Sequence, residues 1–200
     1  MERKGKKARI FTTTLTWNQN AELSYMRSIE ENFHHEIDTI KNRQQRNHNA
    51  LTRYHMLWSL RFDFHLNPPE GEMFPDQTSP SLSSEEQDKC DRLGIYYLRE
   101  DDSYPSHDVA GIQIYGHLSF LMDQYKDLQW GLLEAAEGEF LVSDNYKNMA
   151  YIPIKPTLAF LANQPDQQIS RQQVAQLNKI SIDKANSFYF ARQLSLCPIS

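Results

Sequence analysis

The spacing of the apolar residues changes near residue 129 of this 200-residue chain, and this change constrains the fold more than any other feature. Before it, apolar side chains recur every three or four positions over residues 23–40, 51–66 and 109–128, which is the spacing of one helix face. After it, they fall in short apolar runs that favour strands. Long amphipathic helices followed by strands predict an α+β fold.

The later runs predict a small, mostly antiparallel sheet in the C-terminal third of the chain, with one helix packed on it. The dipeptide Glu137-Gly138 favours a hairpin between the first two runs. The helix is expected to follow Ser170, because Gln173 lies three positions later and completes a capping box. The predicted strands are residues 130–134, 140–143, 151–154, 158–161 and 187–191.

The length of the chain suits a single domain over residues 1–200. Residues 11–17 alternate between apolar and polar side chains, which predicts a short strand near the start. Ser83 and Glu86 predict the start of a further helix, again as a capping box. The expected parts are a basic arm (1–9), a strand and helices (10–66), a proline-rich loop (67–83), helices (84–129) and the sheet with its helix (130–192).

Charge and cysteine content narrow the class of protein. The chain has 21 Lys and Arg against 26 Asp and Glu, a net charge of −5, which argues against a general nucleic-acid coat protein. Residues 1–9 are the exception, with five basic residues against one acidic residue. No apolar stretch approaches the ~18 residues of a membrane span. Two cysteines cannot form a disulfide framework. From the missing membrane span we expect no membrane binding, and from the low cysteine content we expect a cytoplasmic protein.

Ser143-Asp144-Asn145 is the most informative polar motif, because it lies at the end of a predicted strand. Asp144 is the candidate general base or ligand of a divalent cation, and Asn145 would orient it. Lys155, at the end of the next strand, is a third candidate catalytic residue, and Ser143 is a candidate binding residue. The alternative is structural, since Asp and Asn also stabilise turns through their own backbone.

Two other groups of residues carry weaker signals. Arg61 lies beside aromatic residues and could bind a phosphate or stack on a base, although a surface ion pair is the more common role. His34 and Asp38 share a helix face, but a zinc site requires three protein ligands and no such set is evident. Apart from the alternative role of Asp144, we therefore predict no metal ligands, and we assign no cofactor.

Residues 130–192 resemble a bacterial family, domain-of-unknown-function family 4238. The similarity lies in Trp130-Gly131-Leu132-Leu133-Glu134, followed by Glu139 to Asn145. Later parts also resemble the family, namely Tyr151 to Pro156, Val174 to Asn178 and Phe188 to Ala191. The resemblance implies an α+β fold and a bacterial origin, and it brings no reaction with it.

The chain departs from the family at two points. Tyr146 follows Asn145 where the family usually has proline. The family also opens with a His-containing segment, and this chain begins about where that segment ends, so we expect it to lack the segment and any activity that depends on it.

These observations favour a protein-interaction or other non-enzymatic role, with a partner protein suggested by the long loop and the amphipathic helices. The alternative is a metal-dependent, nuclease-like hydrolase that uses Asp144, for which nucleic acid would be the substrate. A further alternative is the remnant of a longer gene with no activity.

Overall fold

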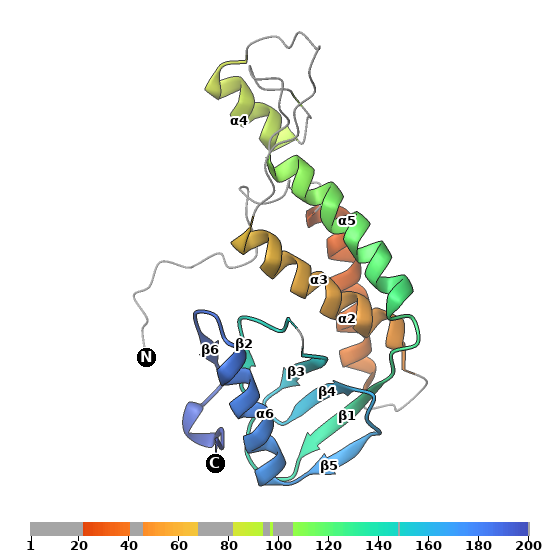
Figure 1. The fold of residues 1–200 in the computed structure, drawn as a ribbon, viewed down its shortest axis with the longest axis vertical. Helices are drawn as coiled ribbons and strands as arrows, with labels where there is room; N and C mark the ends of the chain where they lie inside the picture. The colour runs from red at the N-terminus through yellow and green to blue at the C-terminus, as the bar shows by residue number, and fades with distance from the viewer. Residues whose placement is uncertain are drawn as a thin grey trace. The chain divides into compact units, whose positions relative to one another are not determined.

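The computed structural model describes residues 22–40, 46–67, 82–93, 97, 106–147 and 149–199. The chain divides into two compact units. The first unit comprises Met1–Glu30 and Leu60–Phe120, and the second comprises Glu31–Ser59 and Leu121–Ser200. Helices precede the sheet along the chain, as the colours of Figure 1 show, so the predicted α+β class is confirmed.

The described part of the first unit is helical. Its elements are η1 (Glu22–Met26), the start of α2 (Arg27–Thr39), the end of α3 (His48–Leu66), α4 (Ser84–Leu93) and most of α5 (Ser106–Gln124). The helices α2, α3 and α5 confirm the three helices predicted from the apolar stripes of the sequence. Ser83 caps α4 as predicted, because its N–H donates to the Glu86 carboxylate at 2.8 Å while its hydroxyl accepts the Glu86 N–H at 3.4 Å.

The second unit contains the sheet. Its strands are β1 (Trp130–Ala135), β3 (Tyr151–Lys155), β4 (Leu158–Ala162) and β5 (Gln167–Ile169), in the order β3-β4-β1-β5. The β3–β4 and β4–β1 pairs are antiparallel and the β1–β5 pair is parallel. Two further strands, β2 (Val142–Ser143) and β6 (Tyr189–Phe190), form a separate antiparallel ribbon.

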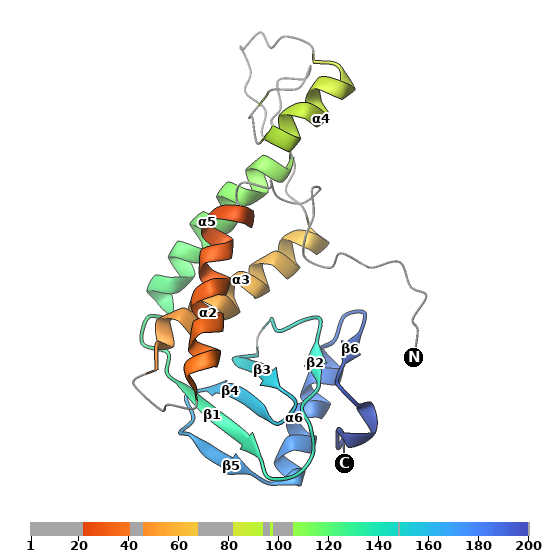
Figure 2. The same ribbon diagram turned by 180° about the vertical axis from the view of Figure 1, so that it is seen from behind.

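The four-stranded sheet is covered on both faces. On one face, Leu133 of β1 packs with Val174 of α6 (Arg171–Lys184), and the two opposite views of Figures 1 and 2 show α6 running along the sheet. On the other face, Phe160 of β4 packs with Phe33 of α2 and Leu51 of α3. Because both faces are buried, the strands are apolar at successive positions instead of alternating with polar residues.

The predicted hairpin between residues 130–134 and 140–143 is wrong. β1 pairs with β4 and β5, whereas β2 pairs with β6. The physical reason lies in the connection. Gly138, with φ +91°, turns the chain, and the next two N–H groups, of Glu139 and Phe140, donate to the carbonyls of Leu196 and Pro156 instead of to β1. Backbone partners from distant segments therefore outcompete the local turn.

Several sequence predictions fall on residues outside the described ranges. These are the basic arm over 1–9, the strand over 11–17 and almost all of the loop over 67–83. Among the described residues, no helix combines the length and apolar character needed to cross a membrane.

Candidate functional site

Asp144, the predicted catalytic residue, directly follows β2 and is only 5% exposed. One carboxylate oxygen accepts the N–H of Asn186 at 2.8 Å, and the other accepts the N–H groups of Ser187 at 2.8 Å and Phe188 at 3.2 Å. Its own N–H donates to the Phe188 carbonyl at 3.2 Å. The side chain of Asp144 therefore fixes the path of the chain into β6.

The neighbours of Asp144 make similar local contacts. The Asn145 side-chain amide donates to the carbonyl of Lys184, the last residue of α6, at 3.0 Å, and its oxygen accepts the Lys147 N–H at 2.8 Å. Ser143 accepts the Asn145 N–H through its hydroxyl at 3.1 Å and donates its own N–H to the Tyr146 hydroxyl at 3.0 Å. Burial raises the pKa of Tyr146, so this hydroxyl stays neutral. The motif thus forms the turn that its residue types also predict.

The other predicted residues lie elsewhere. Lys155 ends β3 with an exposed side chain, and among the described residues no hydrogen bond or ion pair links it to Asp144. Arg61 belongs to the first unit, where it is 5% exposed and forms ion pairs with Glu22 at 2.9 Å and Glu30 at 2.5 Å. These contacts match the structural role that the sequence left open for Arg61, and its binding role stays a prediction.

Asp144→Ala is expected to lower the free energy of unfolding by about 2–3 kcal/mol, because three backbone N–H groups lose a charged acceptor. Asp144→Asn should lose less, since one side-chain oxygen remains. Urea denaturation measures both. Asp183→Ala, which removes an exposed carboxylate from α6, is the control and should change stability by less than about 0.5 kcal/mol. Equal stability of Asp144→Ala and the wild type would contradict the structural role.

Asn178 is a key residue whose role the sequence pattern did not reveal. It lies on α6 and is fully buried. Its oxygen accepts the Leu141 N–H at 2.8 Å, and its amide nitrogen donates to the carbonyls of Glu139 and Pro198, each at 2.9 Å. The available signal was a polar residue four positions after Val174, on the apolar face of the helix. The buried Glu139 carboxylate adds an ion pair to Arg192.

Residues 186–199, which we call the C-terminal segment, combine firm attachment with exposed apolar side chains. Asp144, Asn178 and Glu139 hold it from one side. On its free surface it exposes Tyr189 (43%), Phe190 (50%), Leu194 (55%), Leu196 (42%) and Ile199 (57%). Consecutive residues of a strand point to opposite faces, so the exposure of both Tyr189 and Phe190 shows that both faces of β6 are open.

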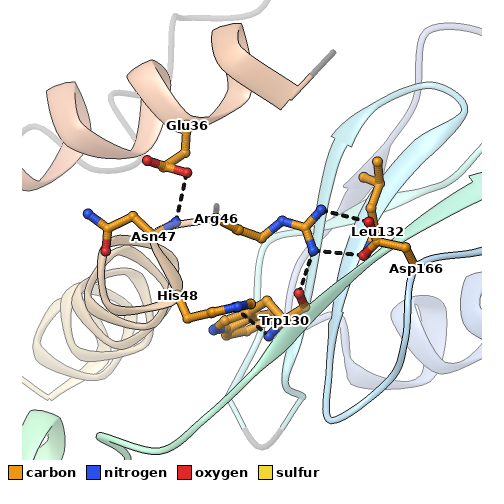
Figure 3. Close-up of polar contacts among 7 residues, drawn as sticks. All are labelled: Glu36, Arg46, Asn47, His48, Trp130, Leu132 and Asp166. Carbon is orange, nitrogen blue, oxygen red and sulfur yellow. Dashed lines mark hydrogen bonds and ion pairs between the residues drawn. The ribbon is translucent and has the colours of Figure 1, made fainter. Parts of the chain in front are cut away.

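Figure 3 shows a second polar network, at the junction of α3 and the sheet. Arg46 donates two hydrogen bonds to the Asp166 carboxylate, at 2.7 and 3.0 Å, and one to the Trp130 carbonyl at 2.7 Å. Asp166 also accepts the Leu132 N–H at 2.8 Å. The guanidinium lies 5.2 Å from the centroid of the Phe160 ring. Arg46 therefore attaches the start of α3 to β1, and its positive charge is paired with the Asp166 carboxylate.

Two histidines of the second unit are held neutral by their surroundings. His48 accepts the Trp130 N–H through Nδ1 at 2.9 Å, and burial, followed by the nearby Arg46, lowers its pKa. His55 is 4% exposed and donates from Nε2 to the Met149 carbonyl, and burial lowers its pKa. Among the residues that the structure describes, no three His, Cys, Asp or Glu side chains gather where one metal ion could bind them.

These histidines predict that stability falls as the pH is lowered. The unfolded chain takes up both protons near the ordinary pKa of 6.5, whereas the folded chain binds them only at lower pH. The stabilisation is therefore complete above pH 6.5 and decreases below it. The urea midpoint should drop between about pH 7.5 and about pH 5.5.

A matched double variant isolates the two histidines from other titrating groups. His48→Asn keeps an acceptor near the position of Nδ1, and His55→Gln keeps a donor near the position of Nε2, but neither side chain titrates. The double variant should lose less stability than the wild type over the same pH range. An equal loss in both proteins would assign the pH dependence to other groups.

Comparisons with known proteins give no relative from which a role could be taken: no family model, no curated protein and no solved structure matches this chain.

Proposed function

We propose that this chain is a protein-interaction module of the bacterial cytoplasm and that β6, with the rest of the C-terminal segment, is its binding surface. The observation that carries the proposal is the exposure of aromatic side chains on both faces of a strand whose path is fixed by buried polar residues. Clustered exposed apolar side chains are typical of interaction sites. Membership of family 4238 is part of this proposal and rests on residues 130–192.

Rigidity strengthens the case for a binding surface. A partner gains more affinity from a surface that is already ordered, because less conformational entropy is lost on binding. Three backbone N–H groups before β6 are bound by Asp144, and the carbonyl of Pro198, near the other end of the C-terminal segment, is bound by Asn178. The exposed side chains of Tyr189 and Phe190 lie between these attachment points.

The alternative of a metal-dependent hydrolase has less support. Both oxygens of Asp144 already accept backbone N–H groups, so a metal ion would have to compete with these bonds. Lys155, the expected neighbour of Asp144 in such a site, forms no hydrogen bond or ion pair with it among the described residues.

Photocrosslinking in growing bacterial cells tests the interaction role. A benzophenone amino acid would replace Phe190 in one protein and Phe120 in another. Phe120 is an equally apolar and more exposed position, at 69%. It lies on α5, where the backbone N–H and carbonyl groups form the hydrogen bonds of the helix. We expect protein adducts from position 190 and few from position 120. An absence of adducts at 190, or equal yields at both positions, would overturn the proposal.

A further inference from the structure

We propose that the partner of β6 is the β6 strand of a second copy of this chain, paired antiparallel about a two-fold axis through Tyr189. This inference rests on the proposed interaction role and names the occupant of the same surface. The backbone of β6, its sequence and its charges all favour this pairing.

The backbone of Tyr189 is available for pairing. In an antiparallel ladder, hydrogen-bonded and non-hydrogen-bonded pairs alternate along the strands. The Asp144 N–H donates to the Phe188 carbonyl, and Val142 and Ser143 are opposite Phe190 and Tyr189. The Ser143–Tyr189 pair is therefore the non-hydrogen-bonded one, so the N–H and carbonyl of Tyr189 point away from β2. Among the described residues, β2 is the only strand that pairs with β6.

The two edges of the ribbon differ in how this outward backbone is used. On β2, the outward N–H of Ser143 is already bound by the Tyr146 hydroxyl at 3.0 Å, and Ser143 is fully buried. On β6, Tyr189 is 43% exposed. Among the described residues, the β6 edge of the ribbon is therefore the one whose outward backbone donor and acceptor have no partner and could pair with a further strand.

The sequence around Tyr189 is self-complementary for antiparallel pairing. If Tyr189 pairs with Tyr189 of the second copy, Phe188 lies opposite Phe190 and Ser187 lies opposite Ala191. The Phe188 and Phe190 rings, 6.4 Å apart within one chain, would form two symmetric aromatic pairs across the new interface. A two-fold interface requires this kind of match, because the same residues meet from both sides.

The charges permit a second copy to approach. Residues 186–191 contain no charged residue and no proline, which are the usual means by which an edge strand prevents pairing. The next residue, Arg192, has its charge balanced by the buried Glu139 and would lie opposite the neutral Asn186 of the other copy. No like charges therefore meet along the paired strands.

A charge-swap experiment tests this geometry. The full chain would be examined by light scattering from micromolar to near-millimolar concentration. We expect the wild type to approach twice the 23.5 kDa chain mass as the concentration rises. Tyr189→Lys and Tyr189→Glu each place like charges at the two-fold axis, so each should dimerise at least about tenfold more weakly. Mixing the two variants places opposite charges there and should restore the dimer.

The controls separate a failed fold from a failed interface. Tyr189 is an exposed side chain, so both variants should keep the thermal unfolding of the wild type. Phe120→Ser removes a more exposed apolar side chain from α5 and should leave dimerisation unchanged. A wild type that stays monomeric at all concentrations, variants that dimerise like the wild type, or a mixture that stays monomeric would each overturn self-pairing.

If the wild type is monomeric while position 190 crosslinks to other proteins, self-pairing is wrong and the interaction role stands. If position 190 yields no adducts, the interaction role fails as well.

Discussion

Gly131→Ala is expected to destabilise the second unit by at least about 3 kcal/mol, enough to prevent its stable folding. Gly131 lies in β1, where the chain segment before β5 passes directly over it. A Cβ atom added there would be 2.0 Å from the Gln164 carbonyl oxygen and 2.7 Å from that of Pro165. These are backbone atoms, so the clash can be relieved only by moving the connection between β4 and β5 away from the sheet.

Gly116→Ala is the matched control for this substitution. Gly116 lies within α5, and an added Cβ atom would meet nothing within 4 Å. Alanine should therefore stabilise the helix by about 0.5–1 kcal/mol, because glycine loses more backbone entropy on folding. Urea denaturation followed by tryptophan fluorescence would measure both variants. The close approach at Gly131 would be disproved if Gly131→Ala were as stable as the wild type.

Asn178→Leu is expected to cost about 3–5 kcal/mol, because three buried backbone groups each lose a hydrogen bond worth roughly 1–3 kcal/mol when left unpaired. The groups are the Leu141 N–H and the carbonyls of Glu139 and Pro198. Leucine keeps the branched skeleton of the asparagine side chain but is larger, so the loss combines the missing hydrogen bonds with some overpacking.

Gln176→Leu likewise replaces an amide side chain with leucine, but at an exposed position of α6. It should alter the free energy of unfolding by less than about 0.5 kcal/mol. The difference between the two variants, measured by urea denaturation, isolates the buried contacts of Asn178. If both substitutions had the same small effect, the three hydrogen bonds would contribute little to stability.

Most helices and strands could be predicted from the sequence because their signals are local. The apolar stripes gave α2, α3 and α5, and the serine caps gave the starts of α4 and α6. The strand pairing could not be predicted in the same way. Glu137-Gly138 looks like a hairpin turn, but the N–H groups that follow it bind the carbonyls of Leu196 and Pro156, which are distant in sequence.

The candidate site shows the same division. The sequence placed Ser143-Asp144-Asn145 at the end of a strand, and the structure has it there. The sequence left a catalytic and a structural role open for Asp144. Only the structure shows that its carboxylate accepts the three N–H groups of residues 186–188. Its catalytic role stays a prediction. The role of Asn178 went unrecognised because nothing nearby in the sequence indicates which backbone groups it faces.

The sequence by itself determined the α+β class, the positions of most elements and the starts of two helices, because spacing and capping act over a few residues. Only the tertiary structure decided that β2 pairs with β6, so that the N–H and carbonyl of Tyr189 point away from β2. It also decided that side chains on both faces of β6 are exposed. It also decided that Gly131 lies under a crossing backbone. Each of these depends on segments far apart in the chain, whose meeting is set by packing and by the need to pair every buried backbone group.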